Sequence, residues 1–321
     1  MDSGGAPSMV VHPAPPGRKT LANVRQALTF TAECYYITKN YLDHAVRFTE
    51  RLIYGQKYLP LRLSQYQGQK KVALCYHGYM QGRPGFERLE RLLESKIFNI
   101  FAVAGGYQPY SQDIRRSADY EREVLAWVLA ETDATEVYLI GHSQGGLVAR
   151  YMVQKLDAAA LVKKCIFLAT PHMGTWAGVA GAANWLVTRA ASLVPGFPLI
   201  EGESALQMLP GSLFLRDLNE TPLPEGMDFL NLYNQLDPLV WPSRFARLPY
   251  TEATNILFKK IGHLQSLYAP QELEIMLRAL MFPTGHRWAL EREILEGQEV
   301  LERRVMGEGG QRYREIVTSS D

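Results

Sequence analysis

Short apolar runs alternate along the chain with longer stretches in which apolar residues recur every three or four positions. This alternation of β-rich and helical patterns is typical of βα units, which build a mostly parallel sheet covered by helices. The apolar runs predict six strands, over residues 71–76, 99–104, 136–140, 164–169, 229–234 and 255–260. The periodic stretches predict helices over residues 86–96, 114–130, 146–156 and 270–281. We therefore predict an α/β fold with a mostly parallel, doubly wound sheet over residues 59–284.

One connection in this pattern is much longer than the others. About 60 residues separate the fourth predicted strand from the fifth, whereas connections in α/β units usually span about 2 to 6 residues. The insertion is rich in apolar and small residues, so we expect a helical cap over residues 173–226. A cap of this kind either lines an apolar binding cleft or completes the core, and the sequence leaves both interpretations open.

The segments outside the sheet pattern differ in composition. Residues 1–19 combine Pro, Gly and charge without periodicity, which predicts a disordered tail. Residues 20–58 carry an amphipathic stripe with several tyrosines, which predicts a long helix that packs on the domain, on a second copy of the chain or at a membrane interface. Residues 285–321 are dense in Glu and Arg, and a thin apolar stripe over 288–306 predicts an exposed helix followed by a tail.

Composition and charge narrow the class of protein. With 47% hydrophobic and 21% charged residues among 321, the chain has the make-up of an ordinary globular protein. Its net charge of +1 gives no electrostatic reason to expect binding to nucleic acid. Cys34, Cys75 and Cys165 are widely spaced and odd in number, so we expect reduced thiols. We see no signal-peptide pattern and no apolar run of about 20 residues, so we expect a cytoplasmic protein, with membrane association as the alternative.

A predicted strand-to-helix junction carries the strongest chemical signal. Residues 137–146 read VYLIGHSQGG, a buried strand that leads into Gly-x-Ser-x-Gly and a helix. This pattern is typical of a nucleophile elbow, in which a tight turn strains the serine backbone and Gly141 and Gly145 remove side chains that would clash. A glycine-rich turn with an incidental serine is the alternative. We predict that Ser143 is a nucleophile.

A serine nucleophile needs a general base, normally a histidine that a carboxylate orients. In hydrolases with this elbow, the acid and then the histidine follow the serine in the chain. Asp237 lies just beyond the predicted strand 229–234, and His263 lies just beyond the strand 255–260. We predict Asp237 as the acid and His263 as the base. Asp228 is the weaker rival acid because it precedes its strand, and a turn-forming Asp-Pro and a packed loop histidine are the non-catalytic alternatives.

Attack by serine on a carbonyl forms an oxyanion, which two fixed N–H groups must stabilise. The backbone N–H of Gln144, the residue after the nucleophile, is one expected donor. The other is the N–H of Tyr79, in the loop that follows the first predicted strand, where His77 and Gly78 would shape the backbone. We see no cluster of metal ligands, phosphate-binding loop or nucleotide fingerprint, so we expect no cofactor and no metal.

The segments CYHGY, GHSQGG, LATPHMGT, YNQLDPLVWP and GHL together resemble those of bacterial true lipases and of the related lipase-like GPI inositol-deacylases. The resemblance extends from about residue 70 to residue 280. It implies an α/β-hydrolase fold, a triad of Ser143, Asp237 and His263, and a structural corner at residues 170–172 beneath the site. The chain departs from the family's lipases, which are usually secreted, in that no signal peptide is visible.

These observations predict a serine hydrolase that cleaves carboxylic esters, with lipid-like acyl chains, through an acyl-enzyme on Ser143. Within the cap we expect Trp176 and Trp185 to contact the acyl chain. Two alternatives stay open. A thioesterase or amidase would use the same triad, and a lipid-binding protein would keep the fold with an inactive site.

Overall fold

The computed structural model describes most of the sheet and its covering helices. The described residues are 28, 31, 35, 68, 70–79, 81, 86, 89, 91–93, 100–104, 112–183, 202–285, 300–306 and 312–318. The strands are β1 (Lys71–Tyr76), β2 (Ile100–Ala104), β3 (Glu136–His142), β4 (Val162–Leu168), β5 (Asp228–Asn234), β6 (Thr254–Phe258), β7 (Val300–Met306) and β8 (Arg312–Thr318). The helices are α3 (Ile114–Glu131), α4 (Gln144–Lys155), α6 (Glu203–Gln207), α7 (Leu213–Glu220) and α8 (Pro270–Met281). Short 3₁₀ turns lie at Ala158–Ala160, Ser243–Ala246 and Leu264–Leu267.

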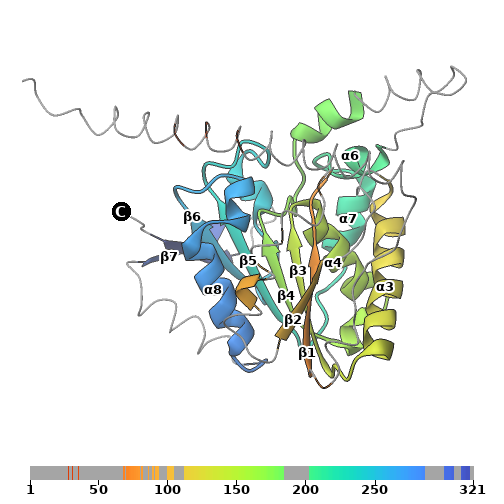
Figure 1. Cartoon of the computed structure of the whole chain (residues 1–321). Coiled ribbons are helices and arrows are strands. Elements are labelled where there is room, and N and C mark those ends of the chain that lie inside the picture. Colours follow the sequence, from red (N-terminus) through yellow and green to blue (C-terminus); the bar gives the residue numbers. More distant parts are fainter. Residues whose placement is uncertain are drawn as a thin grey trace, which may run out of the picture.

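The strands form one sheet in the order β2-β1-β3-β4-β5-β6-β8-β7 (Figure 1). All neighbouring pairs are parallel except β7 and β8, which are antiparallel. The first six strands correspond closely to the six that the apolar runs predict. Strands buried on both faces are continuously apolar in sequence, which explains why they could be recognised.

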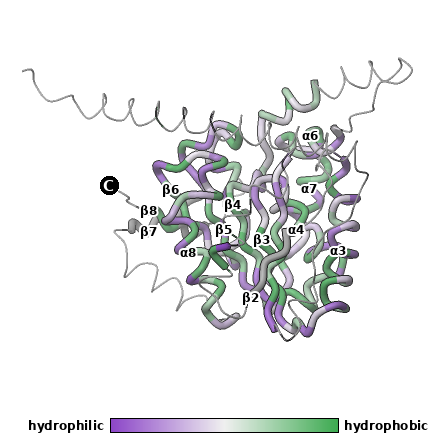
Figure 2. The backbone as a smooth tube through the Cα atoms, viewed as in Figure 1, coloured by the Kyte–Doolittle hydropathy of each residue, from purple (hydrophilic) through white to green (hydrophobic). Residues whose placement is uncertain are grey.

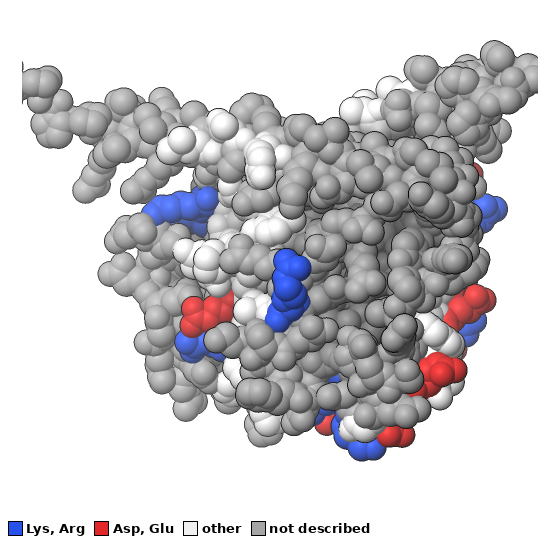
Figure 3. Space-filling model, in the orientation of Figure 1, with Lys and Arg blue, Asp and Glu red and all other residues white. Residues whose placement is uncertain are grey.

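Helices cover both faces of the sheet. Alternate residues of a strand point to opposite faces, so Leu74 packs in one core with α3, α4 and α7, while Cys75 packs in the other with α8. Figure 2 shows the apolar residues concentrated along the strands and on the inward sides of the helices. On the face in Figure 3, described acidic and basic side chains lie near one another at the lower left and lower right, and further basic side chains lie apart near the centre and at the upper left.

The strand register brings the carboxyl ends of the parallel strands to one edge. Tyr76 at the end of β1 is paired with Gly141, and His142 at the end of β3 is paired with Leu168 at the end of β4. Asn234 at the end of β5 is paired with Phe258 at the end of β6. Loops that follow these strands therefore meet at a shared edge, where ligands of open α/β sheets bind.

The C-terminal predictions were wrong over residues 300–306 and 312–318, which extend the sheet beyond the predicted 59–284. Residues 300–306 form strand β7, not the exposed helix predicted over 288–306, and residues 312–318 form strand β8 where a tail was predicted. Pairing with β8 satisfies the backbone of this Glu- and Arg-rich segment, and such tertiary pairing readily outweighs a weak helical preference. Residues 286–299 lie outside the described part of the chain.

Most of the N-terminal predictions fall on residues that the structure does not describe. These include the tail over 1–19 and all of 20–58 except Leu28, Thr31 and Tyr35, which are helical. Leu28 and Tyr35 are largely exposed. Within the described residues, the helices are too short or too polar to cross a bilayer. Cys75 and Cys165 are buried free thiols, and Cys34 lies outside the described residues.

Candidate active site

Ser143 occupies the tight turn between β3 and α4. Its backbone has φ 53° and ψ −125°, a conformation that a residue with a side chain rarely adopts. The turn lies so close to the end of β1 that a Cβ at Gly145 would overlap the carbonyl oxygen of Tyr76. A Cβ at Gly141 would lie 2.5 Å from backbone atoms of Gly146. Both glycines are therefore needed for a turn that lifts the serine out of the strand.

Asp237 and His263 form a buried hydrogen-bonded pair at the same edge. His263 Nδ1 lies 2.7 Å from Asp237 Oδ2, and both side chains are almost completely buried. The other carboxylate oxygen, Oδ1, accepts hydrogen bonds from the backbone N–H groups of Leu239 and Val240, each at 2.8 Å. A carboxylate held in this way fixes the imidazole proton on Nδ1 and leaves Nε2 as the basic nitrogen.

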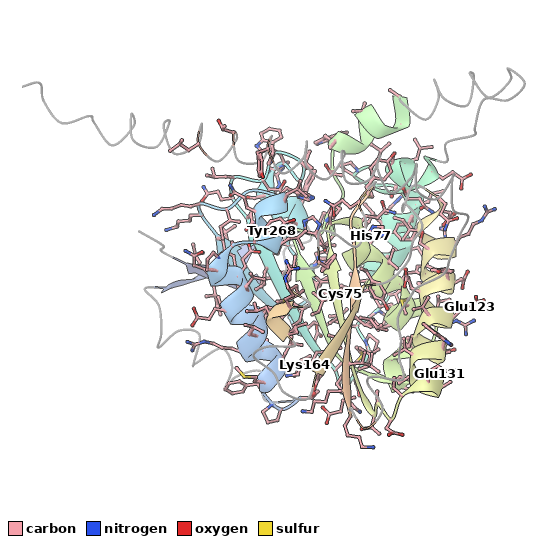
Figure 4. All side chains as sticks on the ribbon, viewed as in Figure 1. Cys75, His77, Glu123, Glu131, Lys164 and Tyr268 are labelled. Carbon is pink, nitrogen blue, oxygen red and sulfur yellow. The ribbon has the colours of Figure 1, made fainter. Side chains whose placement is uncertain are left out.

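Asp228, the rival acid, lies at the opposite end of β5. Its carboxylate is 3.5 Å from the ammonium of Lys164 and accepts a hydrogen bond of 3.1 Å from the backbone N–H of Gly285. In Figure 4, Lys164 lies near the lower end of the sheet and His77 near the upper end. Asp228 is thus separated from His263 by the length of a strand, and the structure brings only Asp237 to that histidine.

The loop after β1 lies directly against the nucleophile turn. A Cβ at Gly78 would be 2.9 Å from the Cβ of Ser143, so only glycine allows this approach. The Gly78 N–H donates to Gln81 Oε1 at 2.9 Å, and the Gln81 N–H donates to the Gly78 carbonyl at 3.2 Å. Since the Gly78 N–H is engaged, Tyr79 remains the candidate oxyanion donor in this loop. The other candidate, Gln144, is the first residue of α4, where the helix dipole favours negative charge.

The contacts of His142 were not predicted from the sequence. Its Nε2 lies 3.0 Å from the carbonyl oxygen of His263, and its Nδ1 lies 3.0 Å from Gln81 Oε1. The two histidine rings are 4.9 Å apart between centroids. Burial, reinforced by the neighbouring His263, holds the pKa of His142 well below its ordinary value. The sequence holds no signal for these contacts, because the two partners come from loops that are far from His142 in the chain.

The cap region follows β4. Residues 177–183 are helical, lie above the sheet in Figure 1, and precede α6 and α7. Trp176, at the start of this helix, is 55% exposed, and Trp185 lies outside the described residues. Thr175 ties the base of the cap to the acid loop, because its hydroxyl donates to the Leu239 carbonyl. Its backbone N–H donates to the Met208 carbonyl at 2.7 Å.

The corner at residues 170–172 belongs to a buried polar network. His172 Nε2 lies 3.2 Å from Asn231 Oδ1, and its Nδ1 lies 3.3 Å from Arg150 Nη1. The Arg150 guanidinium also donates to Asn219 Oδ1 at 3.0 Å and to the Tyr250 hydroxyl at 3.1 Å. Burial lowers the pKa of Arg150 to about 10. Across the described residues, His, Cys, Asp and Glu side chains form no group of three or more that could hold a metal ion.

Comparison with known proteins agrees with this geometry. The family model for the alpha/beta hydrolase fold matches residues 72–269. Over 56 residues, the chain is 52% identical to triacylglycerol lipases of Pseudarthrobacter phenanthrenivorans and Burkholderia plantarii. That stretch covers 16% of this chain, and 17% and 15% of the two lipases. The chain therefore matches about a sixth of the length of these curated relatives.

Among solved structures, the chain resembles lipase B of Aspergillus fumigatus, with a TM-score of 0.55 and 15% sequence identity. The match covers 71% of this chain and 56% of the lipase. At 15% identity, this similarity shows only that the helices and strands are arranged in the same fold. Together with the family match over residues 72–269, it shows that the chain belongs to the α/β-hydrolase fold family.

Proposed function

We propose that this protein is a serine hydrolase that cleaves carboxylic esters through an acyl-enzyme on Ser143. One observation carries the proposal. A serine in a strained strand-to-helix turn and a buried His263–Asp237 pair lie at the same edge of one parallel sheet. This is the set of groups that activates a serine hydroxyl, because the histidine accepts its proton and the carboxylate stabilises the resulting imidazolium.

The proposed reaction uses each group in turn. His263 Nε2 takes the proton of Ser143 as Oγ attacks the ester carbonyl, and the N–H groups of Gln144 and Tyr79 stabilise the oxyanion. The imidazolium then gives its proton to the departing alkoxide, which leaves the acyl group on Ser143. His263 then takes a proton from water, which attacks the acyl-enzyme, and returns this proton to Ser143 Oγ as the carboxylic acid leaves. Removal of one oxyanion donor from such a site typically lowers kcat by about 10² to 10³.

We propose a lipid-like acyl chain as the substrate's acid part. The relatives with 52% identity over 56 residues are triacylglycerol lipases. Several apolar side chains of the cap region are exposed, namely Trp176, Val179, Leu206 and Leu213. Exposed apolar side chains in a cap suit an apolar ligand, because its burial against them removes apolar surface from water.

Labelling of Ser143 by a fluorophosphonate, together with hydrolysis of p-nitrophenyl acetate and decanoate, tests the proposal. Wild type should react with the probe and hydrolyse both esters, and Ser143→Ala should do neither while keeping its melting temperature. Ser212→Ala is the matched control, because the hydroxyl of this serine accepts the Leu215 N–H and caps α7. It should lose about 1 kcal/mol of stability and keep full labelling. If Ser143→Ala hydrolysed the esters within about tenfold of the wild-type rate, Ser143 would not be the nucleophile.

A further inference from the structure

His142 is completely buried behind the nucleophile turn, and the proposed reaction gives it no role. It nevertheless contacts two other loops of the site. Its Nε2 lies 3.0 Å from the carbonyl oxygen of His263, and its Nδ1 lies 3.0 Å from the side chain of Gln81. One side chain thus joins the loop after β3 to the loops after β1 and β6.

Backbone hydrogen bonds between neighbouring strands do not make the connection that His142 makes to His263. β3 and β1 are neighbours, so their backbone ladder already fixes the first two loops relative to each other. β6 is separated from β3 by β4 and β5, so no ladder joins the His263 loop directly to the Ser143 turn. The contact between His142 and the His263 carbonyl spans this separation, 121 residues apart in the chain.

Gln81 completes the connection on the other side. Its Oε1 accepts the N–H of Gly78 at 2.9 Å and lies 3.0 Å from His142 Nδ1. Its own backbone N–H donates to the Gly78 carbonyl at 3.2 Å, which closes the turn from both ends. Gln81 therefore fixes the backbone that precedes Tyr79 and links it to His142.

We infer that His142 and Gln81 are positioning residues, which hold the base His263 and the oxyanion loop in register with the Ser143 turn. The inference rests on the proposed function of that site. Its basis is geometric: a serine, a base and an oxyanion donor come from three loops, and these two side chains connect all three. A displacement of about 1 Å among such groups lowers turnover by about 10²-fold, so the connection affects the rate without contact with substrate.

The two links of His142 differ in strength. A backbone carbonyl only accepts, so Nε2 of a neutral imidazole must carry the proton that it shares with His263. Burial and the adjacent His263 and His77 keep the pKa of His142 low, so Nδ1 carries a lone pair near Gln81. Because Gln81 Oε1 accepts the Gly78 N–H, it faces this lone pair without a hydrogen bond, and Gln81 contacts His142 by packing alone in this tautomer. The link to His263 is thus the stronger one, because a neutral imidazole carries one proton and donates it to the His263 carbonyl.

Two amide substitutions separate the links. In His142→Gln, the side-chain amide reaches the position of Nε2 and keeps a donor for the His263 carbonyl. In His142→Asn, it reaches only the position of Nδ1 and loses that donor. We expect His142→Asn to lower kcat by about 10- to 100-fold with KM changed less than about twofold, and His142→Gln to recover much of the loss. Equal losses for the two variants, or kcat of His142→Asn within about threefold of wild type, would overturn the inference.

A double-mutant cycle tests whether Gln81 belongs to the same unit. Gln81→Ala should lower kcat clearly in the wild-type background and much less in a His142→Leu background, because the link is already lost there. Effects that multiply in the double variant would show that the two residues act independently, contrary to the inference.

His172→Asn is the matched control, since this histidine is also fully buried but contacts Arg150 and Asn231. It should lower the melting temperature and leave kcat within about twofold at a temperature where the protein is folded. Fluorophosphonate labelling of wild type separates the two proposals. If wild type is not labelled, the proposed function fails, whereas if it is labelled and the His142 variants keep full kcat, only the positioning role fails.

Discussion

At the scale of single residues, the position of a carboxylate along its strand decides whether it can act on the base. Asp228 begins β5, where it pairs with Lys164, and Asp237 lies in the loop beyond the end of the same strand, where it contacts His263. Asp228, in an ion pair with Lys164, and Asp237, beside the His263 imidazole, are thus nine residues apart. Substitution of each by Asn should therefore have different effects on turnover and on stability.

Asp237→Asn should lower kcat by about 10² to 10⁴, because an amide that presents its NH₂ group to Nδ1 favours the wrong histidine tautomer. Asp228→Asn should leave kcat unchanged and lower the melting temperature by a few degrees, because Lys164 loses its buried ion pair. Steady-state kinetics and thermal unfolding of both variants check this. If Asp228→Asn lowered kcat more than Asp237→Asn, the catalytic acid would be Asp228 and not Asp237.

The residues of the site were not equally predictable. Ser143, Asp237 and His263 could be placed because each follows an apolar run that marks the end of a strand, and parallel strands end at one edge. The contact between His142 and Gln81 could not be placed. This contact joins residues 61 positions apart and depends on the geometry of two turns, so no periodic pattern in the sequence predicts it.

At the scale of elements, burial explains which strands were predictable. β1 to β6 are mostly apolar in sequence, and apolar side chains of β1, β3, β4, β5 and β6 pack into the two cores on either face of the sheet. β7 and β8 read VLERRVM and RYREIVT, in which charges interrupt the apolar residues as is usual near the edge of a sheet. The pairing of β7 and β8 depends on partner strands elsewhere in the chain, so local patterns favoured a helix over β7 and a tail over β8 instead.

The helix that begins beside Trp176 belongs to the cap region, and its exposed tryptophan should act on substrate selection rather than on stability. Trp176→Ala should lower kcat/KM for a decanoate ester by about one power of ten, because apolar contact with the chain is lost, and should leave acetate hydrolysis nearly unchanged. Trp127→Ala is the control, since this tryptophan is also partly exposed but lies on α3. Equal losses for both esters, with unchanged thermal stability, would show that Trp176 does not contact the acyl chain.

At the scale of the whole molecule, buried histidines make stability depend on pH. His142 and His172 are fully buried, and burial holds both pKa values well below the ordinary value of about 6.5. Below about pH 6.5, the unfolded chain binds protons at these positions that the folded protein does not bind. The stability that each neutral histidine supports is therefore present above this pH and is lost as the pH falls.

Urea unfolding at pH 7.5, 6.5 and 5.5 measures this loss. Each such histidine adds up to about 1.4 kcal/mol of lost unfolding free energy per pH unit, once the unfolded histidine is protonated. His172→Asn should be less stable than wild type at pH 7.5, with a shallower fall in stability toward pH 5.5. Carboxylates titrate alike in both proteins, so parallel curves for the two would contradict the prediction.

The order of strands in the sheet has a consequence for how the chain folds during synthesis. Residues up to His263 supply every side chain of the proposed triad, but the strand that covers the edge of β6 is β8, at Arg312–Thr318. Until β8 is made, β6 presents unpaired backbone groups, which favour pairing with other chains. A nascent or truncated chain that ends near residue 285 would therefore carry every side chain of the proposed triad beside an open, aggregation-prone edge.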